Sequence, residues 1–206
     1  MTACQLTAHG TPGRFELKEL PDPRPGPGEA VVRVAACGLN HLDLWLEADG
    51  LPITPRLPRT PGGEVAGTVT ALGAGVTGWT AGNRVAVQSN LFCGECEFCR
   101  RGEESLCLQG ELLGVQRDGG FATHCVVPAR ALVRLPDAVD FTTSAALTLA
   151  GSTAMHMLTD RAEVRTGDWV LVIGGASAAG PAAIQNARGV GRRGIATASS
   201  PAPAAV

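Results

Sequence analysis

The sequence is poor in charge of either sign. Lys, Arg, Asp and Glu make up 17% of its 206 residues, whereas about a quarter is usual in a globular domain. The formal net charge is −2, so the chain lacks the excess of basic side chains with which proteins bind nucleic acid or an anionic membrane surface. Neither nucleic acid nor a membrane is therefore expected as a partner.

Targeting and membrane-spanning signals are also lacking. Residues 1–10 contain neither the basic segment nor the apolar segment of a secretory signal. The longest uncharged run, residues 141–159, carries seven Ser and Thr residues and His156, which suits a buried helix better than the hydrocarbon of a bilayer. We therefore expect a cytoplasmic protein.

Turn-forming residues, in contrast, are abundant. The chain has 27 glycines and 14 prolines, about a fifth of its length, against about 12% in an average protein. Residues 1–135 show short alternating or apolar runs bounded by turn signals, and this pattern predicts an all-β domain, a barrel or a sandwich. The predicted strands cover residues 15–20, 30–36, 65–72, 84–87, 121–127 and 131–135.

The pattern changes after Pro136. Asp140 is a suitable N-cap for a helix from Phe141 toward Leu149, and after an interruption at Gly151 a second helix is expected from about Ser152 to before Arg165. The rest of the chain predicts one strand–helix–strand unit, because a continuous apolar run is typical of a parallel strand covered on both faces. Its parts are a strand over Trp169–Ile173, a glycine-rich turn, a helix over Pro181–Arg188 and a strand near Ile195.

Seven cysteines without a secretory signal indicate metal binding or catalysis, because the cytosol keeps thiols reduced. Four of them have the spacing C-x2-C-x2-C-x7-C within a lobe over residues 90–109, and four thiolates can close a tetrahedron around one zinc ion. Such a site has no open position, so its role is structural. Free cysteines or a redox C-x-x-C pair are the alternatives, but a redox pair normally opens a helix of a thioredoxin-like unit, and that pattern is missing. The four ligands are Cys93, Cys96, Cys99 and Cys107.

The other three cysteines, Cys4, Cys37 and Cys125, lie in strand-like surroundings and are interpreted as small buried hydrophobic residues.

The glycine-rich turn indicates a nucleotide. Gly175 and Gly180 meet the G-x-G-x-x-G template, with Ser177 at its middle position and Ala178 where glycine is common. Between a buried strand and a helix, such a turn presents backbone N–H groups to a pyrophosphate; an ordinary tight turn is the alternative. The segment 197–200 after the second strand contains no acidic residue to bind the ribose of NAD. This absence favours NADP(H) over NAD(H).

Four segments together resemble the medium-chain dehydrogenase/reductase superfamily, which includes zinc-type alcohol dehydrogenases and quinone oxidoreductases. The resemblance implies an α/β plus β architecture: a GroES-like β-barrel catalytic domain, then a partial Rossmann domain, which is a doubly wound parallel sheet. The segments are the cysteine lobe, Ala36–Asp43 (ACGLNHLD), Pro61–Gly67 (PGGEVAG) and the glycine-rich turn. We place the catalytic domain at residues 1–135, and the inter-domain helices and partial Rossmann domain at residues 136–206.

Alcohol dehydrogenases of this superfamily hold a second, catalytic zinc ion. The positions that match its ligands are Asn40, Gly63 and Leu149, none of which is a usable ligand, and only Glu64 lies nearby. The resemblance therefore implies the zinc-free quinone oxidoreductase branch. A hydrogen-bond donor must then stabilise the developing oxyanion, and Asn40 and His41 are the candidate catalytic residues.

Two of these assignments have a structural alternative. His41 could be an ordinary surface histidine. Thr153, which by resemblance contacts the nicotinamide end of the cofactor, could simply pack a helix.

The resulting hypothesis is an oxidoreductase that transfers a hydride between NAD(P)H and a small carbonyl, enone or quinone, with one structural zinc ion and no catalytic zinc. The chain stops after the second Rossmann strand, so the alternative is a truncated, catalytically inactive, zinc-stabilised fragment of such an enzyme. The resemblance is also compatible with a homo-oligomer.

Overall fold

The computed structural model describes residues 1–53 and 55–199, and these form two compact units, residues 1–148 and 149–199. No helix within the described ranges combines the length and the apolar character needed to cross a bilayer. The domain boundary expected after residue 135 stays a prediction.

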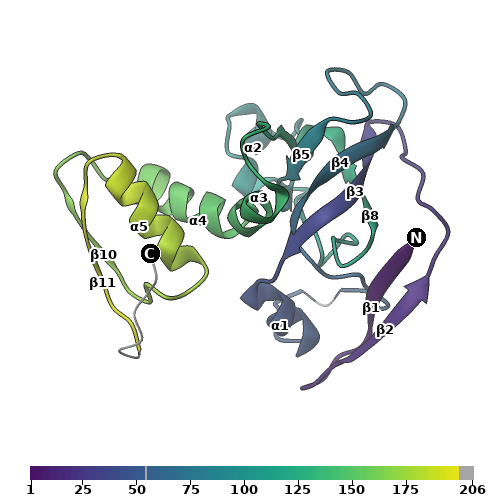
Figure 1. Ribbon diagram of the computed structural model, residues 1–206, viewed down its shortest axis with the longest axis horizontal. Helices are drawn as coiled ribbons and strands as arrows, with labels where there is room; N and C mark the ends of the chain where they lie inside the picture. The colour runs from purple at the N-terminus through teal and green to yellow at the C-terminus, as the bar shows by residue number, and fades with distance from the viewer. Residues whose placement is uncertain (54, 200–206) are drawn as a thin grey trace. The chain divides into compact units, whose positions relative to one another are not determined.

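A five-stranded antiparallel sheet organises the first unit (Figure 1). The long strands β3 and β4 lie at its centre, where they pair over almost their whole length. The strand order is β8-β3-β4-β5-β9, with β3 at Glu29–Gly38, β4 at Glu64–Leu72, β5 at Arg84–Val87, β8 at His124–Pro128 and β9 at Leu132–Arg134.

The core of the first unit lies on this sheet and consists largely of valines. β-branched side chains suit a pleated, half-buried surface, and alternation along each strand sends them to the same face. Helix α3 (Phe141–Thr148) packs against β3 and β4. The fully buried valines of the core are Val32, Val65, Val69, Val85, Val87 and Val127.

Two small two-stranded antiparallel sheets complete the sheet structure of this unit. Strand β1 (Thr2–Ala8) pairs with β2 (Arg14–Glu19), and β6 (Asn90–Leu91) pairs with β7 (Glu111–Leu112). A 3₁₀ turn, η2 (Ala129–Ala131), connects β8 to β9. The strand predicted over residues 15–20 agrees with the bounds of β2 to within one residue at each end, and the one predicted over residues 84–87 has the bounds of β5. Strands β1, β6 and β7 were not predicted.

Helix α1 (His41–Glu47), which follows β3 directly, was not predicted from the sequence. Asn40 is its N-cap, and Asn40 and Asp43 form a reciprocal capping box. The helix has only seven residues, too short for a clear 3.6-residue repeat, although the Asn-x-x-Asp spacing is a start signal of the capping-box type.

Asp140 caps helix α3 as predicted. Its carboxylate accepts hydrogen bonds from the backbone N–H of Thr143 at 2.8 Å and from the Thr143 hydroxyl at 2.7 Å. These bonds lower the pKa of Asp140. The break before the next helix falls at Leu149, whereas the sequence analysis placed it at Gly151, which lies inside helix α4 (Ala150–His156).

The second unit contains the predicted strand–helix–strand unit. Strand β10 (Trp169–Val172) pairs in parallel with β11 (Arg193–Ala196), and helix α5 (Ala179–Gly189) connects them. Helix α4, which continues into a π-helical turn at Met157–Arg161, packs against α5. The small core between them is made of Ala154, Leu158, Ala182 and Ala183, with Val170 and Val172 of β10.

The expectation that β10 is covered on both faces is wrong for the described residues. Val170 and Val172 pack on the core, but Trp169 is 63% exposed and Leu171 is 61% exposed. A continuous apolar run in the sequence therefore does not distinguish a strand buried on one face from a strand buried on both.

We expect Leu113→Ala to lower the free energy of unfolding by about 2–5 kcal/mol, because Leu113 is 1% exposed in the core and its truncation leaves a cavity. Leu17→Ala is the matched control: Leu17 is 77% exposed on β2, and a change within about 0.5 kcal/mol is expected. Urea unfolding followed by far-UV circular dichroism measures both. Equal losses would contradict the assignment of Leu113 to the core.

Candidate functional site

The cysteine lobe is built from short turns with very little core of its own. Cys93 follows β6, Cys96 is the N-cap of the one-turn helix α2 (Glu97–Arg100), and Cys99 lies on that helix. Cys107 follows a 3₁₀ turn, η1 (Glu104–Leu106). From residue 90 to residue 109, Leu91 is the buried hydrophobic residue. Hydrophobic packing therefore contributes little to the stability of this lobe.

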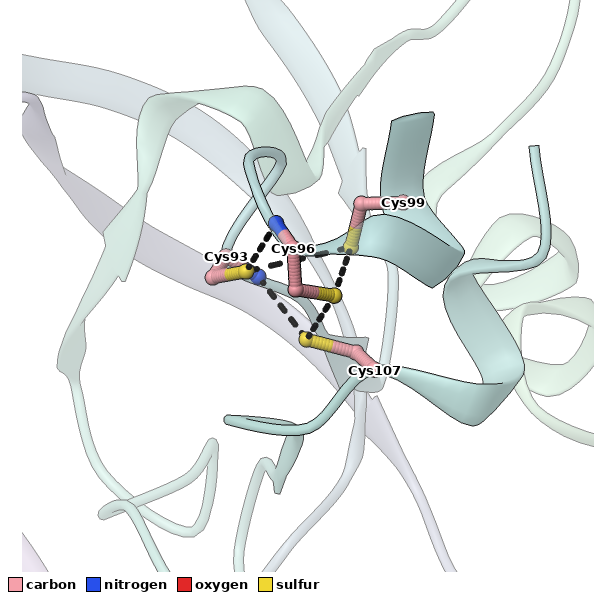
Figure 2. A group of neighbouring side chains, drawn as sticks. All are labelled: Cys93, Cys96, Cys99 and Cys107. Carbon is pink, nitrogen blue, oxygen red and sulfur yellow. Dashed lines mark hydrogen bonds between the residues drawn. The ribbon is translucent and has the colours of Figure 1, made fainter. Parts of the chain in front are cut away.

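The four sulfur atoms converge on one point (Figure 2). Cys96 Sγ lies 3.5 Å from Cys99 Sγ and 3.9 Å from Cys107 Sγ, and Cys93 Sγ lies 3.9 Å from Cys99 Sγ. All four lie within 4.8 Å of one another, and all are free thiols. A zinc–sulfur distance of about 2.3 Å implies tetrahedron edges of about 3.8 Å, so the spacing fits a zinc ion.

Backbone N–H groups favour the thiolate form at two of these cysteines. Hydrogen bonds from the N–H groups of residues 99 and 108 lower the pKa of Cys96 to about 6. Those from residues 95 and 96 lower the pKa of Cys93. Burial instead raises the pKa of Cys99 to about 12. A bound cation would have to deprotonate Cys99, because zinc binds cysteine as the thiolate.

Asn40, a predicted catalytic residue, lies in a second polar group at the junction of β3, α1 and β4. Its side-chain oxygen accepts from the backbone N–H of Leu42 at 3.1 Å, and its Nδ2 donates to Glu64 Oε1 at 3.1 Å. Glu64 is 3% exposed. Asp43 accepts from the backbone N–H groups of Asn40 at 2.9 Å and Gly62 at 3.3 Å. Burial nevertheless raises the pKa of Asp43.

Cys37 lies beside this group, at the end of β3, and is not poised as a thiolate. Burial, together with the nearby Asp43 carboxylate, raises the pKa of Cys37 to about 12. Its sulfur is enclosed so closely that a Cβ atom added at Gly62 or Gly120 would lie 2.8 Å from it. Cys37 and the buried Cys125 both pack in the main core, whereas Cys4 on β1 is half-buried.

Two of the three positions that match ligands of a second zinc ion, Asn40 and Gly63, make other contacts in the structure. Asn40 is bonded to Glu64, and a Cβ atom at Gly63 would lie 3.0 Å from the carbonyl oxygen of Leu113. Leu149 belongs to the other unit. Within the part of the chain that the structure describes, the cysteine lobe is the group of three or more Cys, His, Asp or Glu residues that could hold a metal ion.

His41 is exposed at the first position of α1, and its ring meets the ring of Trp45 edge-on, with 5.0 Å between the centroids. The His41 side chain is therefore accessible to a substrate. This exposure agrees equally with a catalytic proton donor and with an ordinary surface histidine. Thr153 is exposed on α4, so it does not serve to pack α4 within its own unit.

The glycine-rich turn joins β10 to α5 and depends on close backbone packing. A Cβ atom at Gly180 would lie 2.7 Å from the carbonyl carbon of Gly175, and one at Gly175 would lie 2.7 Å from Cβ of Ala196. Ser177 Oγ accepts a hydrogen bond from the backbone N–H of Gly180 at 3.2 Å, and its own hydrogen is left for another acceptor. Ala178 is exposed immediately before α5.

The end of β11 secures the other side of the turn. Thr197 accepts two hydrogen bonds there, from Gly175 N–H to its carbonyl oxygen at 2.7 Å and from Gly174 N–H to its hydroxyl at 3.2 Å. The exposed Ala198 and Ser199 follow, and Ser200 lies outside the described residues.

Comparison with known proteins gives the family. Residues 26–137, just over half of the chain, match the alcohol dehydrogenase GroES-like domain. The chain belongs to the GroES-like alcohol dehydrogenase family. An alcohol dehydrogenase of Geobacillus stearothermophilus is 34% identical over 178 residues, which cover 86% of this chain and 52% of the relative.

Solved structures of this alcohol dehydrogenase family agree. The crystal structure of an NAD-dependent alcohol dehydrogenase matches with a TM-score of 0.92 and 40% identity over 97% of this chain and 58% of that one. A thermostable alcohol dehydrogenase from Pyrobaculum aerophilum, solved with cobalt and zinc bound, matches with a TM-score of 0.87 and 35% identity over 95% of this chain and 59% of that one. The predicted membership of the medium-chain dehydrogenase/reductase superfamily is confirmed. The chain spans slightly more than half the length of the relatives that it matches.

We expect Gly180→Ala to destabilise the second unit by about 1–3 kcal/mol, because the added methyl group would overlap the backbone of the turn. Gly189→Ala is the matched control on the same helix. A Cβ atom there meets nothing within 4 Å, so this substitution should stabilise α5 by up to about 1 kcal/mol. Hydrogen exchange of the α5 amides measures both changes. The close packing of the turn would be refuted if both variants exchanged alike.

Proposed function

We propose that the protein is an oxidoreductase that transfers a hydride between NADP(H) and a small carbonyl compound, enone or quinone. The observation that carries this proposal is the turn between β10 and α5, where Gly175 and Gly180 allow backbone and helix to approach closely. A turn of this kind at the carboxyl end of a parallel strand is a binding site for a dinucleotide pyrophosphate. Membership of the alcohol dehydrogenase family supports the same reaction class.

In this proposal the strand–helix–strand unit is the beginning of a Rossmann domain, and its turn holds the pyrophosphate. Ser177 offers a hydroxyl hydrogen at the turn, and Thr153 is accessible for contact with the nicotinamide end. A bound NADPH would supply the hydride for the acceptor carbon, and negative charge would then develop on the acceptor oxygen.

Two residues of the first unit complete the reaction in this proposal. The Asn40 amide would donate a hydrogen bond to the oxygen as negative charge develops on it, which is the task of an oxyanion-hole donor. The exposed His41 would act as the general acid that supplies the proton completing the alcohol or enol. Asn40 and His41 remain proposed catalytic residues.

The proposed preference for NADP(H) over NAD(H) rests on the side chains that follow strand β11. Thr197, Ala198 and Ser199 offer no carboxylate for the ribose hydroxyls that NAD presents. The Ser199 side chain can donate to a phosphate instead. One solved relative is described as NAD-dependent, and for this chain we propose NADP(H).

We also propose that Cys93, Cys96, Cys99 and Cys107 hold one structural zinc ion per chain. The sulfur spacing fits a tetrahedral ion, and a lobe with so little buried apolar surface needs another source of stability. A solved relative is described as cobalt- and zinc-bound. The zinc would have four protein ligands and no open position, so it would take no part in hydride transfer.

Elemental analysis of the purified chain should find one zinc ion per chain. Cys96→Ser should abolish binding and expose the lobe to proteolysis, because it removes one of four ligands. Cys4→Ser, which changes a half-buried thiol on β1, should retain the ion. Two zinc ions per chain would contradict the proposal that the catalytic zinc site is lost. A chain without zinc would contradict the proposed structural site.

Titration with NADPH should change its fluorescence, with weaker binding of NADH. Gly175→Ala should abolish the change, because its methyl group would press on Ala196 and disturb the turn. Gly194→Ala on β11 is the control, since the nearest atom to its added Cβ lies at 4.0 Å. No fluorescence change at millimolar NADPH would overturn the proposal and leave the inactive, zinc-stabilised fragment.

A further inference from the structure

The carboxamide of Asn40 is fixed at both of its ends. Its oxygen accepts from the first turn of α1, at the N–H of Leu42, and its nitrogen donates to Glu64. Turning the amide over would place its oxygen against the carboxylate and its NH₂ against a backbone donor, so the two contacts together select one orientation.

Glu64 can reach Asn40 because the opposite strand has no side chain in the way. Gly38 faces Glu64 in the register of β3 with β4, and a Cβ atom at Gly38 would collide with Glu64 Oε2. The Glu64 side chain is almost wholly buried, and a buried carboxylate requires hydrogen-bond donors. Glu64 is therefore held by the sheet and in turn holds the amide.

An amide nitrogen carries two hydrogens, and the Glu64 contact uses one of them. Because the NH₂ group is planar, fixing the first hydrogen also fixes the direction of the second. A preorganised donor stabilises a developing oxyanion far better than one that must first rotate into place. We propose that Glu64 is a positioning residue, which orients Asn40 so that its second amide hydrogen is presented to the substrate oxygen.

This inference rests on the proposed function for the identity of the reaction, but the pairing of Glu64 with Asn40 can be tested without turnover. The test compares Asn40→Asp, Glu64→Gln and the double variant in the full chain. Asn40→Asp keeps the helix cap but sets two carboxylates side by side in a buried place. The double variant restores a hydrogen bond in the reverse direction, from the new amide at position 64 to the new carboxylate at position 40.

Thermal unfolding tests the pair. Asn40→Asp should lower the Tm by about 5–10 °C, because like charges are buried together, and adding Glu64→Gln should recover most of that loss. Glu19→Gln, at an exposed position on β2, should change nothing in either background. If Glu64→Gln failed to rescue Asn40→Asp, the pairing would be wrong.

Kinetics test the positioning role. Although its stability is recovered, the double variant lacks the donor at position 40, so its kcat should fall about 10²–10³-fold with little change in KM. Glu64→Gln alone should lower kcat less and also leave KM unchanged, because Asn40 keeps its donor but loses part of its orientation. Wild-type kcat in Glu64→Gln would overturn the role of Glu64, and wild-type kcat in the stable double variant would overturn Asn40 as the donor that Glu64 positions.

A wild-type chain that neither binds NADPH nor turns over would instead overturn the proposed function, and the positioning role with it. Rescue of the Tm would then still establish the pair as a structural contact. The two failures are thus distinguishable.

Discussion

The pairing of β3 with β4 is the constraint on which the first unit and its candidate site both depend. This antiparallel register sets Gly38 opposite Glu64 and buries Val65 in the core. A slip of one residue would send the Glu64 carboxylate to the other face of the sheet and Val65 out of the core. The burial of the valines therefore also fixes the position of the carboxylate that holds Asn40.

In the cysteine lobe, the positions of the four sulfur atoms do not depend on a strand register or on a hydrophobic core. Its backbone forms only single turns, and Leu91 supplies its buried hydrophobic contact. Its four sulfur atoms lie within 4.8 Å of one another, with backbone N–H groups directed at Cys93 and Cys96. In the proposed zinc site, binding of the ion would supply the stability that a hydrophobic core supplies elsewhere in the unit.

These differences explain what the sequence could and could not predict. The four cysteines of the lobe are close neighbours along the chain, so their spacing alone indicated convergence. The strands over residues 84–87 and 65–72 were also predictable, because apolar runs bounded by turn residues are local signals. Asn40 and Glu64 are separated by 24 positions, and their contact follows only from the register of two strands. Helix α1 carried a local signal, the Asn40–Asp43 capping box, which the sequence analysis did not use.

In the second unit, the glycine-rich turn keeps its packing although one face of the sheet is exposed. Trp169 and Leu171 are exposed on one face of β10. The glycine-rich turn does not depend on that face, because its contacts are made within the turn and with the end of β11. Gly180 packs against the turn backbone, Gly175 packs against Ala196, and Thr197 accepts two backbone hydrogen bonds. All of these contacts lie within the single strand–helix–strand unit. The shape of the proposed pyrophosphate site therefore depends on β10, α5 and β11, whereas the stability of that shape depends on how firmly this unit is folded.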